Sequence, residues 1–317
     1  MRAIVTGGAG FIGSNLVDRL LDAGHSVAVI DNLSTGSHAN LAGARDRHGE
    51  RVSVSEHDLR DPSTIALVER LQPEVVFHLG AQIDVRVSVV DPVLDAQVNI
   101  IGSLHVLEGA TRAGARKVVF ASSGGTIYGE PQGDQLPVDE SYPQRPVSPY
   151  GVAKKAVSDY LFAYQQLHGL EFTSLALANI YGPRQDPHGE AGVVAIFAGA
   201  LLGGQPCRIF GSGEQTRDFV YVDDVADAFV RAGAAGAGSG LVINIGTGVE
   251  TSVNELYRAM AKAAGVTTPP VYEAARAGEL QRSSLAAGLA RAELGWEPRT
   301  DLVAGAAATL DWFRERV

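Results

Sequence analysis

A glycine pattern directly after the first apolar run constrains the fold of this chain more than any other feature. The run Ala3–Thr6 is strand-like, and Gly7, Gly10 and Gly13 follow it at three-residue spacing. Gly7 permits a tight turn, Gly10 lets the backbone approach a pyrophosphate, and Gly13 lets a helix pack closely on the strand. The helix would direct free N–H groups and its positive dipole end at the phosphates. The pattern therefore predicts a dinucleotide site between the first strand and the first helix.

A carboxylate indicates which dinucleotide this site prefers. Asp31 ends the second strand-like run, 21 residues after Gly10, where a carboxylate can bind both hydroxyls of the adenosine ribose. The same charge would repel a 2′-phosphate, and no arginine or lysine follows before Arg45. The sequence therefore predicts NAD as the cofactor rather than NADP.

The first half of the chain alternates short apolar runs with amphipathic stretches. The expected strands are Ala3–Thr6, Ser26–Asp31, Val52–Glu56, Val75–Leu79, Val118–Ser122 and Thr173–Leu177. The expected helices between them are Ile12–Ala23, Ser63–Leu71, Val93–Ala113 and Tyr150–His168. This alternation predicts parallel βαβ units, and the nearly continuous apolar runs predict strands covered on both faces. The predicted fold class is therefore α/β, a doubly wound parallel (Rossmann) sheet with a smaller C-terminal α/β substrate domain.

The rhythm of strands and helices changes after Asn179, where glycine-rich loops surround an expected helix, Val193–Leu202. Two later stretches, a strand and helix over 220–234 and a buried strand over 242–245, return to the earlier pattern. We therefore expect residues 1–179 plus 218–247 to form the NAD-binding domain. Residues 180–217 plus 248–317 are expected to form the domain that binds the substrate.

Composition excludes several classes of function. The formal charge is −10, with 36 acidic and 26 basic residues, which argues against a nucleic-acid binder. Cys207 is the single cysteine, so the chain can form neither an intrachain disulfide nor a cysteine-rich metal site, and no metal is expected. Neither a signal peptide nor a membrane-spanning run is recognisable, so we expect a cytoplasmic protein with no membrane partner.

A tyrosine and a lysine near the start of one helix form a candidate catalytic pair. Tyr150 and Lys154 lie four residues apart, behind a Ser148-Pro149 helix start, and therefore share one helix face. A nearby ammonium stabilises a phenolate, and the helix N-terminus acts in the same direction. We therefore expect a lowered pKa for Tyr150, which would make its phenol a usable general base.

Taken together, these motifs resemble the extended short-chain dehydrogenases, in particular their NAD-dependent epimerase/dehydratase group. The segments in the family's order and spacing are Thr6–Gly13, Asp58–Leu59, His78–Ala81, Asn99, Tyr150 with Lys154, and Asn179–Arg184. The resemblance covers almost the whole chain and implies that Asp58 contacts adenine and that Lys154 also binds the nicotinamide ribose. The implied cofactor-binding residues are Gly7, Gly10, Phe11, Ile12, Gly13, Asp31, Asn32, Asp58, Leu59, Leu79, Gly80, Ala81, Gln82, Asn99, Ser122, Tyr150 and Lys154.

The chain departs from the family pattern at the third catalytic residue, a hydroxyl after the fifth strand. The position that usually supplies it, four residues before Tyr128, is Gly124. Either Ser123 or Thr126 must then bridge to the sugar hydroxyl, or the site works without that bridge. We favour Ser123 and place Thr126 second.

The same segment indicates the reaction. Sugar dehydratases that resemble this chain carry an Asp-Glu pair before the Tyr-Gly, and decarboxylases carry a Glu, whereas no acid follows Gly124 here until Glu130. Oxidation and reduction at one carbon remain, so the resemblance implies reversible epimerisation at carbon 4 of a UDP-hexose through a 4-keto sugar and tightly bound NAD. Another NAD-dependent nucleotide-sugar epimerase, a dehydratase or a decarboxylase stays an alternative, as does a non-enzymatic NAD-sensing regulator.

The resemblance also implies where the sugar nucleotide binds. The implied substrate-binding residues are Val85, Ser88, Thr126, Asn179, Val193, Arg217, Arg276 and Ser283. The guanidinium groups of Arg217 and Arg276 suit a diphosphate, and the small Ser283 would leave room for a 2-acetamido group. Ile83 replaces a lysine that many epimerases use to bind the pyrophosphate, so cofactor affinity is expected to be lower. Family members usually form homodimers through two helices per subunit, here Val93–Ala113 and Tyr150–His168.

Overall fold

The fold is built on a parallel sheet of seven strands. The computed structural model describes residues 1–131, 134–187, 192–275 and 280–316. The strand order is β11-β6-β5-β4-β1-β2-β3, and each neighbouring pair is parallel. The strands are β1 (Arg2–Thr6), β2 (Ser26–Asp31), β3 (Val52–Glu56), β4 (Val75–His78), β5 (Lys117–Ser123), β6 (Glu171–Leu177) and β11 (Leu241–Ile245). The predicted doubly wound α/β fold is confirmed.

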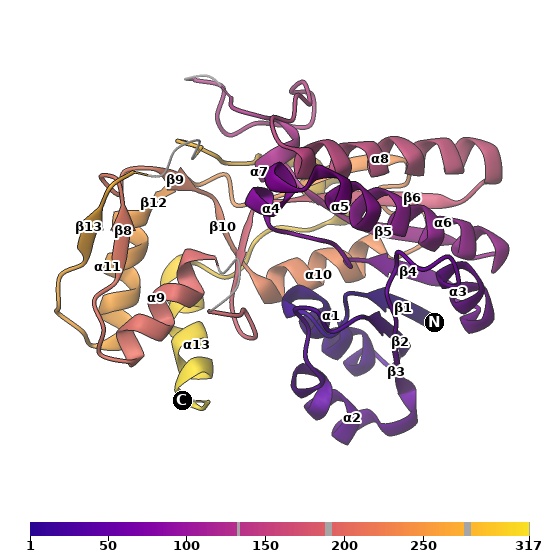
Figure 1. Cartoon of the computed structure of the whole chain (residues 1–317), viewed down its shortest axis with the longest axis horizontal. Helices are drawn as coiled ribbons and strands as arrows, with labels where there is room; N and C mark the ends of the chain where they lie inside the picture. The colour runs from indigo at the N-terminus through magenta and orange to yellow at the C-terminus, as the bar shows by residue number, and fades with distance from the viewer. Residues whose placement is uncertain (132–133, 188–191, 276–279, 317) are drawn as a thin grey trace.

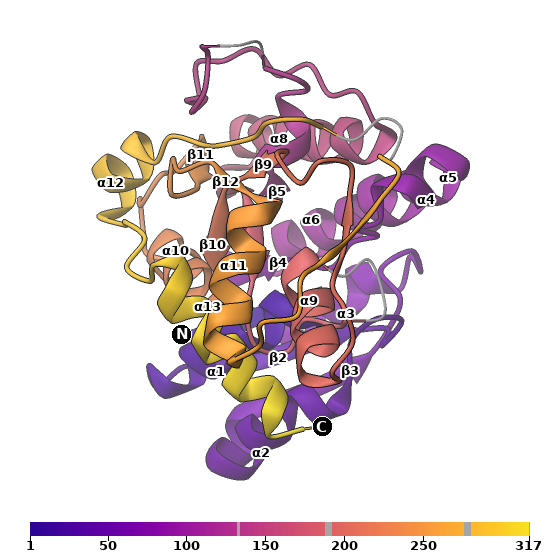
Figure 2. The ribbon, with the colours of Figure 1, turned by 90° about the vertical axis from the view of Figure 1, so that its left-hand side faces the viewer.

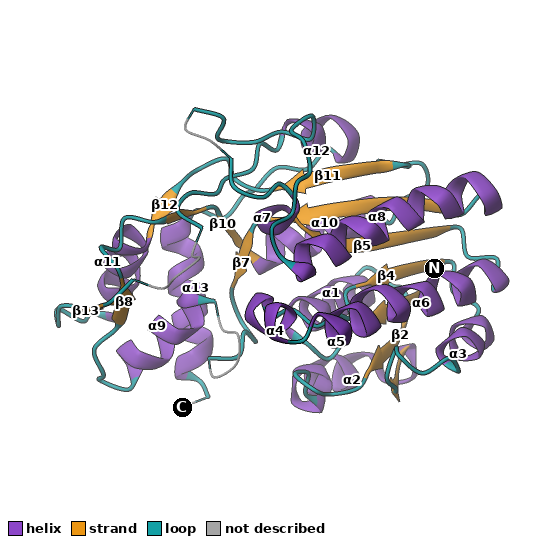
Figure 3. Cartoon of the chain, turned by 45° about the horizontal axis from the view of Figure 1, so that its top comes forward, coloured by secondary structure: helices purple, strands orange, loops and turns teal. Residues whose placement is uncertain are grey.

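Helices cover both faces of this sheet, as Figure 3 shows. On one face lie α3 (Thr64–Leu71), α6 (Gly102–Arg112) and α8 (Pro149–His168); on the other lie α1 (Phe11–Asp22), α2 (Ala42–His48), α10 (Val222–Ala232) and α12 (Gly288–Leu294). The short 3-10 turns His38–Leu41 and Gly49–Arg51 flank α2. In α1, Leu16, Val17, Leu20 and Leu21 are all fully buried against the sheet, and each such leucine contributes roughly 1.5–3 kcal/mol.

The helix expected over Val93–Ala113 is interrupted. The chain forms α4 (Val85–Val90) and α5 (Pro92–Ala96), then a π-helical turn over Gln97–Ile101 that leads into α6. Such turns occur frequently at functional sites because the extra residue redirects the side chains on either side. The turn contains Asn99, one of the residues predicted to bind the cofactor.

A second hydrophobic core lies beside the sheet, at the left of Figure 1. Its helices are α9 (Val193–Leu202), α11 (Val253–Ala264) and α13 (Leu302–Arg314), which lie side by side in Figure 2. Short strands complete it: β7 (Asn179–Tyr181) with β10 (Phe219–Tyr221), β8 (Arg208–Phe210) with β13 (Val271–Glu273), and β9 (Thr216–Arg217) with β12 (Thr251–Ser252). By contrast, α12 packs on the core of the large sheet through Ala290 and Leu294.

Candidate active site

The glycine loop lies where the strand order of the sheet reverses, with β4 on one side of β1 and β2 on the other. Ligands of doubly wound sheets bind at this point, outside the carboxyl ends of the strands. Gly7 has φ +67°, and a Cβ there would lie 2.8 Å from the nitrogen of Gly80. A Cβ at Gly13 would lie 2.1 Å from the Gly7 carbonyl oxygen. The loop therefore requires these glycines, and α1 begins at their end with Gly10 as its N-cap.

Asp31 is turned onto this glycine loop from the end of β2. It is 8% exposed, and its Oδ2 accepts the N–H of Ala9 at 2.9 Å while Oδ1 accepts the N–H of Leu33 at 2.8 Å. The carboxylate thus orders the loop, and each oxygen keeps a lone pair that a ribose hydroxyl can use. The structure places Asp31 where the sequence predicts it.

The residues implied to contact adenine lie just after the carboxyl ends of β2 and β3. Asp58 accepts two hydrogen bonds from the Arg60 side chain, at 3.0 and 2.7 Å, and one from Asn32 at 3.2 Å. The hydrogen bond with Arg60 is the main reason that the pKa of Asp58 lies well below its usual value. Asp58, Arg60, Gln97 and nearby residues line a groove of about 760 Å³, which offers an ionised carboxylate to a ligand.

The loop after β4 is fixed by hydrogen bonds from both sides. Thr6 Oγ1 accepts the N–H groups of Leu79 and Gly80 at 3.1 and 3.0 Å. Gln82 and Asn99 exchange two bonds of 2.9 Å, from the Gln82 N–H to Asn99 Oδ1 and from Asn99 Nδ2 to the Gln82 carbonyl. The other residues implied for the cofactor at this edge are Phe11 and Ile12, which begin α1, and Leu59 and Ala81.

His78, which precedes that loop, is a packed residue. It is 1% exposed, and burial lowers its pKa to about 3, with Lys154 acting in the same direction. Thr6 Oγ1 lies 2.7 Å from Nδ1, and Ser103 Oγ lies 2.8 Å from Nε2. Because Thr6 already accepts two N–H groups, its hydroxyl donates to Nδ1, and the neutral ring donates from Nε2. His78 therefore supports the loop without carrying charge.

Tyr150 and Lys154 meet the end of β5 from the first turns of α8. Ser148 caps this helix by accepting the N–H of Gly151 at 3.2 Å, as its sequence predicts. Lys154 Nζ lies 5.6 Å from the centre of the Tyr150 ring and donates to the Ala121 carbonyl at 2.9 Å. The side chain of Ser123, at the end of β5, lowers the pKa of Tyr150 by hydrogen bonding. Phenol, ammonium and serine hydroxyl therefore meet where the candidate site requires them.

The expected lowering of the Tyr150 pKa is wrong for the chain itself. Burial raises the pKa of Tyr150 to about 12; the Ser123 hydrogen bond lowers it and the charge of Asp95 raises it further. Burial also lowers the pKa of Lys154 to about 8, against the charge of Asp95. The loss of hydration thus outweighs the attraction that helix spacing predicts. Tyr150 is therefore protonated at neutral pH and must lose that proton before it can act as a base.

The structure distinguishes the two candidate hydroxyls. Ser123 contacts Tyr150, whereas Thr126 Oγ1 donates to the Ser123 carbonyl at 3.3 Å. The Ser122 Oγ is buried and has no hydrogen-bond partner among the described residues. At Gly124, a Cβ would lie 2.3 Å from Leu285 Cδ1 and 3.1 Å from the Ala176 carbonyl oxygen. The missing family hydroxyl thus reflects a contact with Leu285, and Ser123 is the hydroxyl beside the tyrosine.

The residues implied for the substrate are spread over several elements. Asn179 and Val193 begin β7 and α9, Arg217 ends β9 with Nη1 donating to the Thr216 carbonyl at 2.8 Å, and Ser283 is 8% exposed. Arg276 lies outside the described residues. Val85 begins α4, and the hydroxyl of the buried Ser88 donates to its carbonyl at 2.6 Å, so this serine bonds within its own helix. Ile83 is 54% exposed.

The sequence analysis assigned no role to Asp218, although in the structure its side chain joins several segments of the second half of the chain. Its buried carboxylate accepts the N–H groups of Thr247, Gly248 and Leu285 and the Thr247 hydroxyl, at 2.5 to 3.1 Å. Burial raises its pKa, and these hydrogen bonds oppose the shift. Asp218 therefore joins three distant segments and places Leu285 beside Gly124. Local spacing carries no signal for such a contact.

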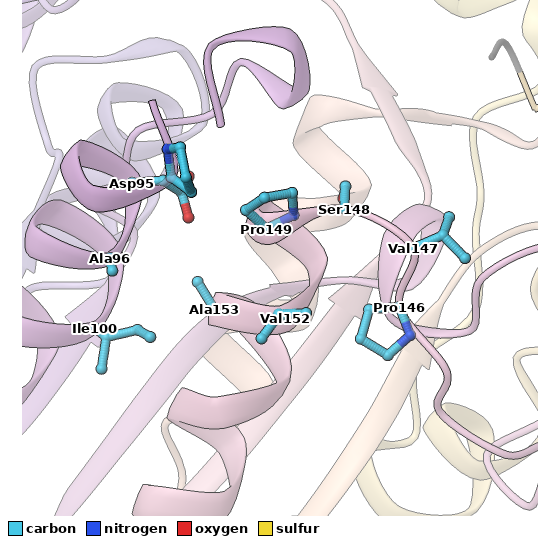
Figure 4. A pocket seen from close by; sticks show the side chains of 10 residues that line it. Asp95, Ala96, Ile100, Pro146, Val147, Ser148, Pro149, Val152 and Ala153 are labelled. Carbon is cyan, nitrogen blue, oxygen red and sulfur yellow. The ribbon is translucent and has the colours of Figure 1, made fainter. Parts of the chain in front are cut away.

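A second carboxylate that the sequence analysis missed is Asp95 of α5, which lies beside the first turns of α8. Together with residues that include Pro149 and Ala153 it lines a groove of about 480 Å³, shown in Figure 4.

Among the described residues, no group of three or more His, Cys, Asp or Glu side chains could hold a metal ion. Within the same described ranges, no helix combines the length and apolar character needed to cross a membrane.

Comparison with known proteins decides the family. The model of the NAD dependent epimerase/dehydratase family matches residues 3–246, more than three quarters of the chain. This chain belongs to the NAD dependent epimerase/dehydratase family. The membership confirms the resemblance seen in the sequence and the prediction of NAD as cofactor. The site fits that cofactor, because the glycine loop leaves no room for a Cβ and Asp31 faces it from β2.

Similar members of the NAD dependent epimerase/dehydratase family are 4-epimerases of UDP-glucose. The UDP-glucose 4-epimerase of Mycolicibacterium smegmatis is 50% identical over 316 residues, covering 100% of this chain and 99% of the relative. The structure of the Thermotoga maritima UDP-glucose 4-epimerase with UDP-glucose has a TM-score of 0.92 at 44% identity and covers 99% of both chains. The Thermus thermophilus UDP-glucose 4-epimerase in complex with NAD has a TM-score of 0.90 at 43% identity and full coverage of both.

Proposed function

We propose that this chain is an enzyme that interconverts UDP-glucose and UDP-galactose by epimerisation at carbon 4. The observation that carries the proposal is the cluster of Tyr150, Lys154 and Ser123 beside the cofactor crevice. The segment between Ser123 and Tyr128 forms α7 (Gly124–Ile127) and contains no carboxyl group that could support elimination of water. The similarity to UDP-glucose 4-epimerases over the full chain supports the same reaction.

Different residues have different roles in one reversible oxidation of the sugar. The glycine loop and Asp31 would hold NAD, which would supply a hydride acceptor for carbon 4 and a hydride donor for the opposite face of the 4-keto sugar. Once deprotonated to the phenolate, Tyr150 takes the proton of the 4-hydroxyl as the hydride leaves and gives it back in the second half of the cycle. Because burial raises the pKa of Tyr150 to about 12, the phenolate needs a neighbouring positive charge to stabilise it. Ser123 orients the phenol, and Lys154 holds a positive charge beside it.

The second half of the chain binds the nucleotide in this proposal. The proposal assigns Arg217 and Arg276 to the diphosphate, Asn179, Val193, Val85 and Ser88 to the sugar, and Thr126 to the support of Ser123. The two units are 1–179 plus 218–247 for NAD and 180–217 plus 248–317 for the nucleotide sugar. The second core supports this division, because α9, α11 and α13 pack in it, although Phe219 also packs there and α12 packs on the core of the large sheet.

Ser283 extends the proposal to the N-acetylated pair of UDP-hexoses. This serine is nearly buried on the segment that Asp218 holds against the site. Its small side chain leaves space where a larger one would meet a 2-acetamido group. The enzyme should therefore also turn over UDP-N-acetylglucosamine.

The enzyme acts in the cytoplasm as a homodimer in this proposal. The helices implied to form the dimer expose apolar side chains, including Val93 at 65%, Val152 at 50% and Phe162 at 54%. A second copy would cover them. Light scattering on the purified protein gives the mass of the assembly, and Phe162→Glu should shift it towards one subunit.

The test of the function is direct. Incubation with UDP-glucose should yield UDP-galactose, followed by the anomeric proton signals in NMR spectra until the two sugars reach equilibrium. A 4-keto-6-deoxy sugar as final product would indicate a dehydratase instead. Binding of NAD without any change in the sugar would favour the NAD-sensing regulator.

A further inference from the structure

Asp95 is a buried carboxylate that the proposed mechanism does not use. It lies on α5 and is 1% exposed. Its Oδ1 accepts Nδ2 of Asn99 at 2.8 Å and Nε2 of Gln82 at 3.0 Å. Both donors belong to the set of residues implied to bind the cofactor, and they also bond to each other. A single carboxyl oxygen therefore connects the loop after β4 with the π-helical turn.

The position of Asp95 also brings its charge to the catalytic pair. Helix α5 packs against the first turns of α8, where Figure 4 shows Asp95 on the side of the groove opposite Pro149 and Ala153. Burial raises the pKa of Asp95, whereas the bonds from Gln82 and Asn99 and the charge of Lys154 lower it. The pKa of Lys154 responds in the opposite sense, since burial lowers it and the charge of Asp95 raises it. Each group thus makes the charge of the other less costly to bury.

The other groups around Lys154 cannot supply this charge. His78, from β4, is held neutral by its two hydrogen bonds and its burial. From β5 come the Phe120 ring, 4.8 Å from Nζ, and the Ala121 carbonyl. Tyr150 on α8 itself is protonated at neutral pH. Of the groups named here, Asp95 is the one whose charge raises the pKa of Lys154.

We propose that Asp95 is a positioning residue for epimerisation, which braces Gln82 and Asn99 at the cofactor loop and supplies the counter-charge that keeps Lys154 an ammonium ion. The inference rests on the proposed function, because an ammonium at position 154 matters for turnover only if Tyr150 does its chemistry beside it. The two parts of the role can be separated, since the brace needs a hydrogen-bond acceptor and the counter-charge needs an anion.

Asp95→Asn separates them, because asparagine keeps Oδ1 as an acceptor for both amides and removes the negative charge. The chain contains four lysines, so protein labelled with ¹³C at lysine Cε gives four signals that can be titrated, and Lys154→Met assigns one of them. We expect the pKa of Lys154 to fall by about 1 pH unit or more in the variant. Lys117 is an internal control: it is equally buried, but its pKa responds to burial, Glu171 and Arg116.

Turnover and cofactor binding give two further readouts. In Asp95→Asn, the alkaline limb of the profile of kcat against pH should move to lower pH by the same amount, because Lys154 loses its proton earlier. The dissociation constant of NAD, measured by fluorescence below that limb, should change little. Asp95→Ala removes the acceptor as well, so it should shift the lysine titration equally and weaken NAD binding about tenfold, the cost of an unmade hydrogen bond to a buried amide. Asp159→Asn, an exposed change on α8 that breaks the pair with Lys155, should alter none of these values.

The outcomes separate this inference from the proposed function. An unchanged Lys154 titration in both Asp95 variants would overturn the counter-charge, and unchanged NAD affinity in folded Asp95→Ala would overturn the brace. If the unmodified protein fails to epimerise UDP-glucose, the proposed function falls, while the lysine titration and the NAD affinity still decide what Asp95 does.

Discussion

The half of this molecule that carries the glycine loop and the half proposed to bind the sugar nucleotide are built in different ways. Around the glycine loop, backbone segments approach so closely that a Cβ at Gly7 or Gly13 would collide with backbone atoms. On the side proposed for the sugar, the candidate residues sit on separate elements, and one buried carboxylate, Asp218, joins the segments of Thr247 and Leu285. A site made of backbone depends on which residues lack a side chain, whereas a site made of side chains depends on long-range packing. The two halves should therefore respond differently to substitution.

The largest effect is expected at Tyr150, where the halves meet. Tyr150→Phe removes the proton acceptor and should lower kcat by about 10²–10⁴-fold, with NAD affinity unchanged because the glycine loop is untouched. Ser123→Ala should cost less, and Thr126→Ala least, since Thr126 bonds to the Ser123 carbonyl rather than to the phenol. Steady-state assays with UDP-galactose order the three variants. A Tyr150→Phe enzyme with near-normal kcat would remove Tyr150 from the chemistry.

Gly13→Ala should disable the cofactor half alone. Its Cβ would lie 2.1 Å from the Gly7 carbonyl oxygen, so the loop must shift. A cost near 3 kcal/mol corresponds to a loss of NAD affinity of roughly 100-fold. Isothermal titration with NAD measures it, and UDP affinity should stay the same. Gly288→Ala is the matched control, because a Cβ there meets no atom within 4 Å. Equal NAD affinity for both variants would show that the loop tolerates a side chain.

Ser283→Tyr should impair only the turnover of sugars that carry a 2-acetamido group. The larger side chain would fill the space assigned to the 2-acetamido group, so kcat/KM for UDP-N-acetylglucosamine should fall at least tenfold relative to UDP-glucose. NAD affinity should not change. If the unmodified enzyme turns over UDP-glucose well and the acetamido sugar not at all, the assignment of this pocket to Ser283 is wrong.

The smallest effect is expected at the contact between the halves. Gly124→Ala places a Cβ 2.3 Å from Leu285 Cδ1, the end of a side chain that can move in part, so the free energy of unfolding should fall by about 1–2 kcal/mol. In a Leu285→Ala background the same change should cost much less. Urea unfolding of the four proteins gives the coupling free energy. Additive effects would mean that Leu285 does not explain the glycine at position 124.

The sequence predicted the fold and the cofactor edge because both depend on local patterns. Alternating apolar runs predicted six of the seven strands of the large sheet within one or two residues, and the seventh followed from Val242–Ile245. The π-helical turn was missed because its helical periodicity looks continuous. The pKa of Tyr150 was predicted in the wrong direction, since i,i+4 spacing reveals the attraction of Lys154 but not burial or Asp95. Asp95 and Asp218 were missed because their partners are distant in the chain or visible only once the chain is folded.

The central claim is that the hydrogen on carbon 4 leaves as a hydride to NAD and returns within the same site. Epimerisation of UDP-glucose carrying deuterium at carbon 4, followed by ²H NMR of the product, tests it most directly. The account predicts UDP-galactose that keeps the deuterium at carbon 4. Product with ordinary hydrogen there, drawn from the solvent, would contradict it.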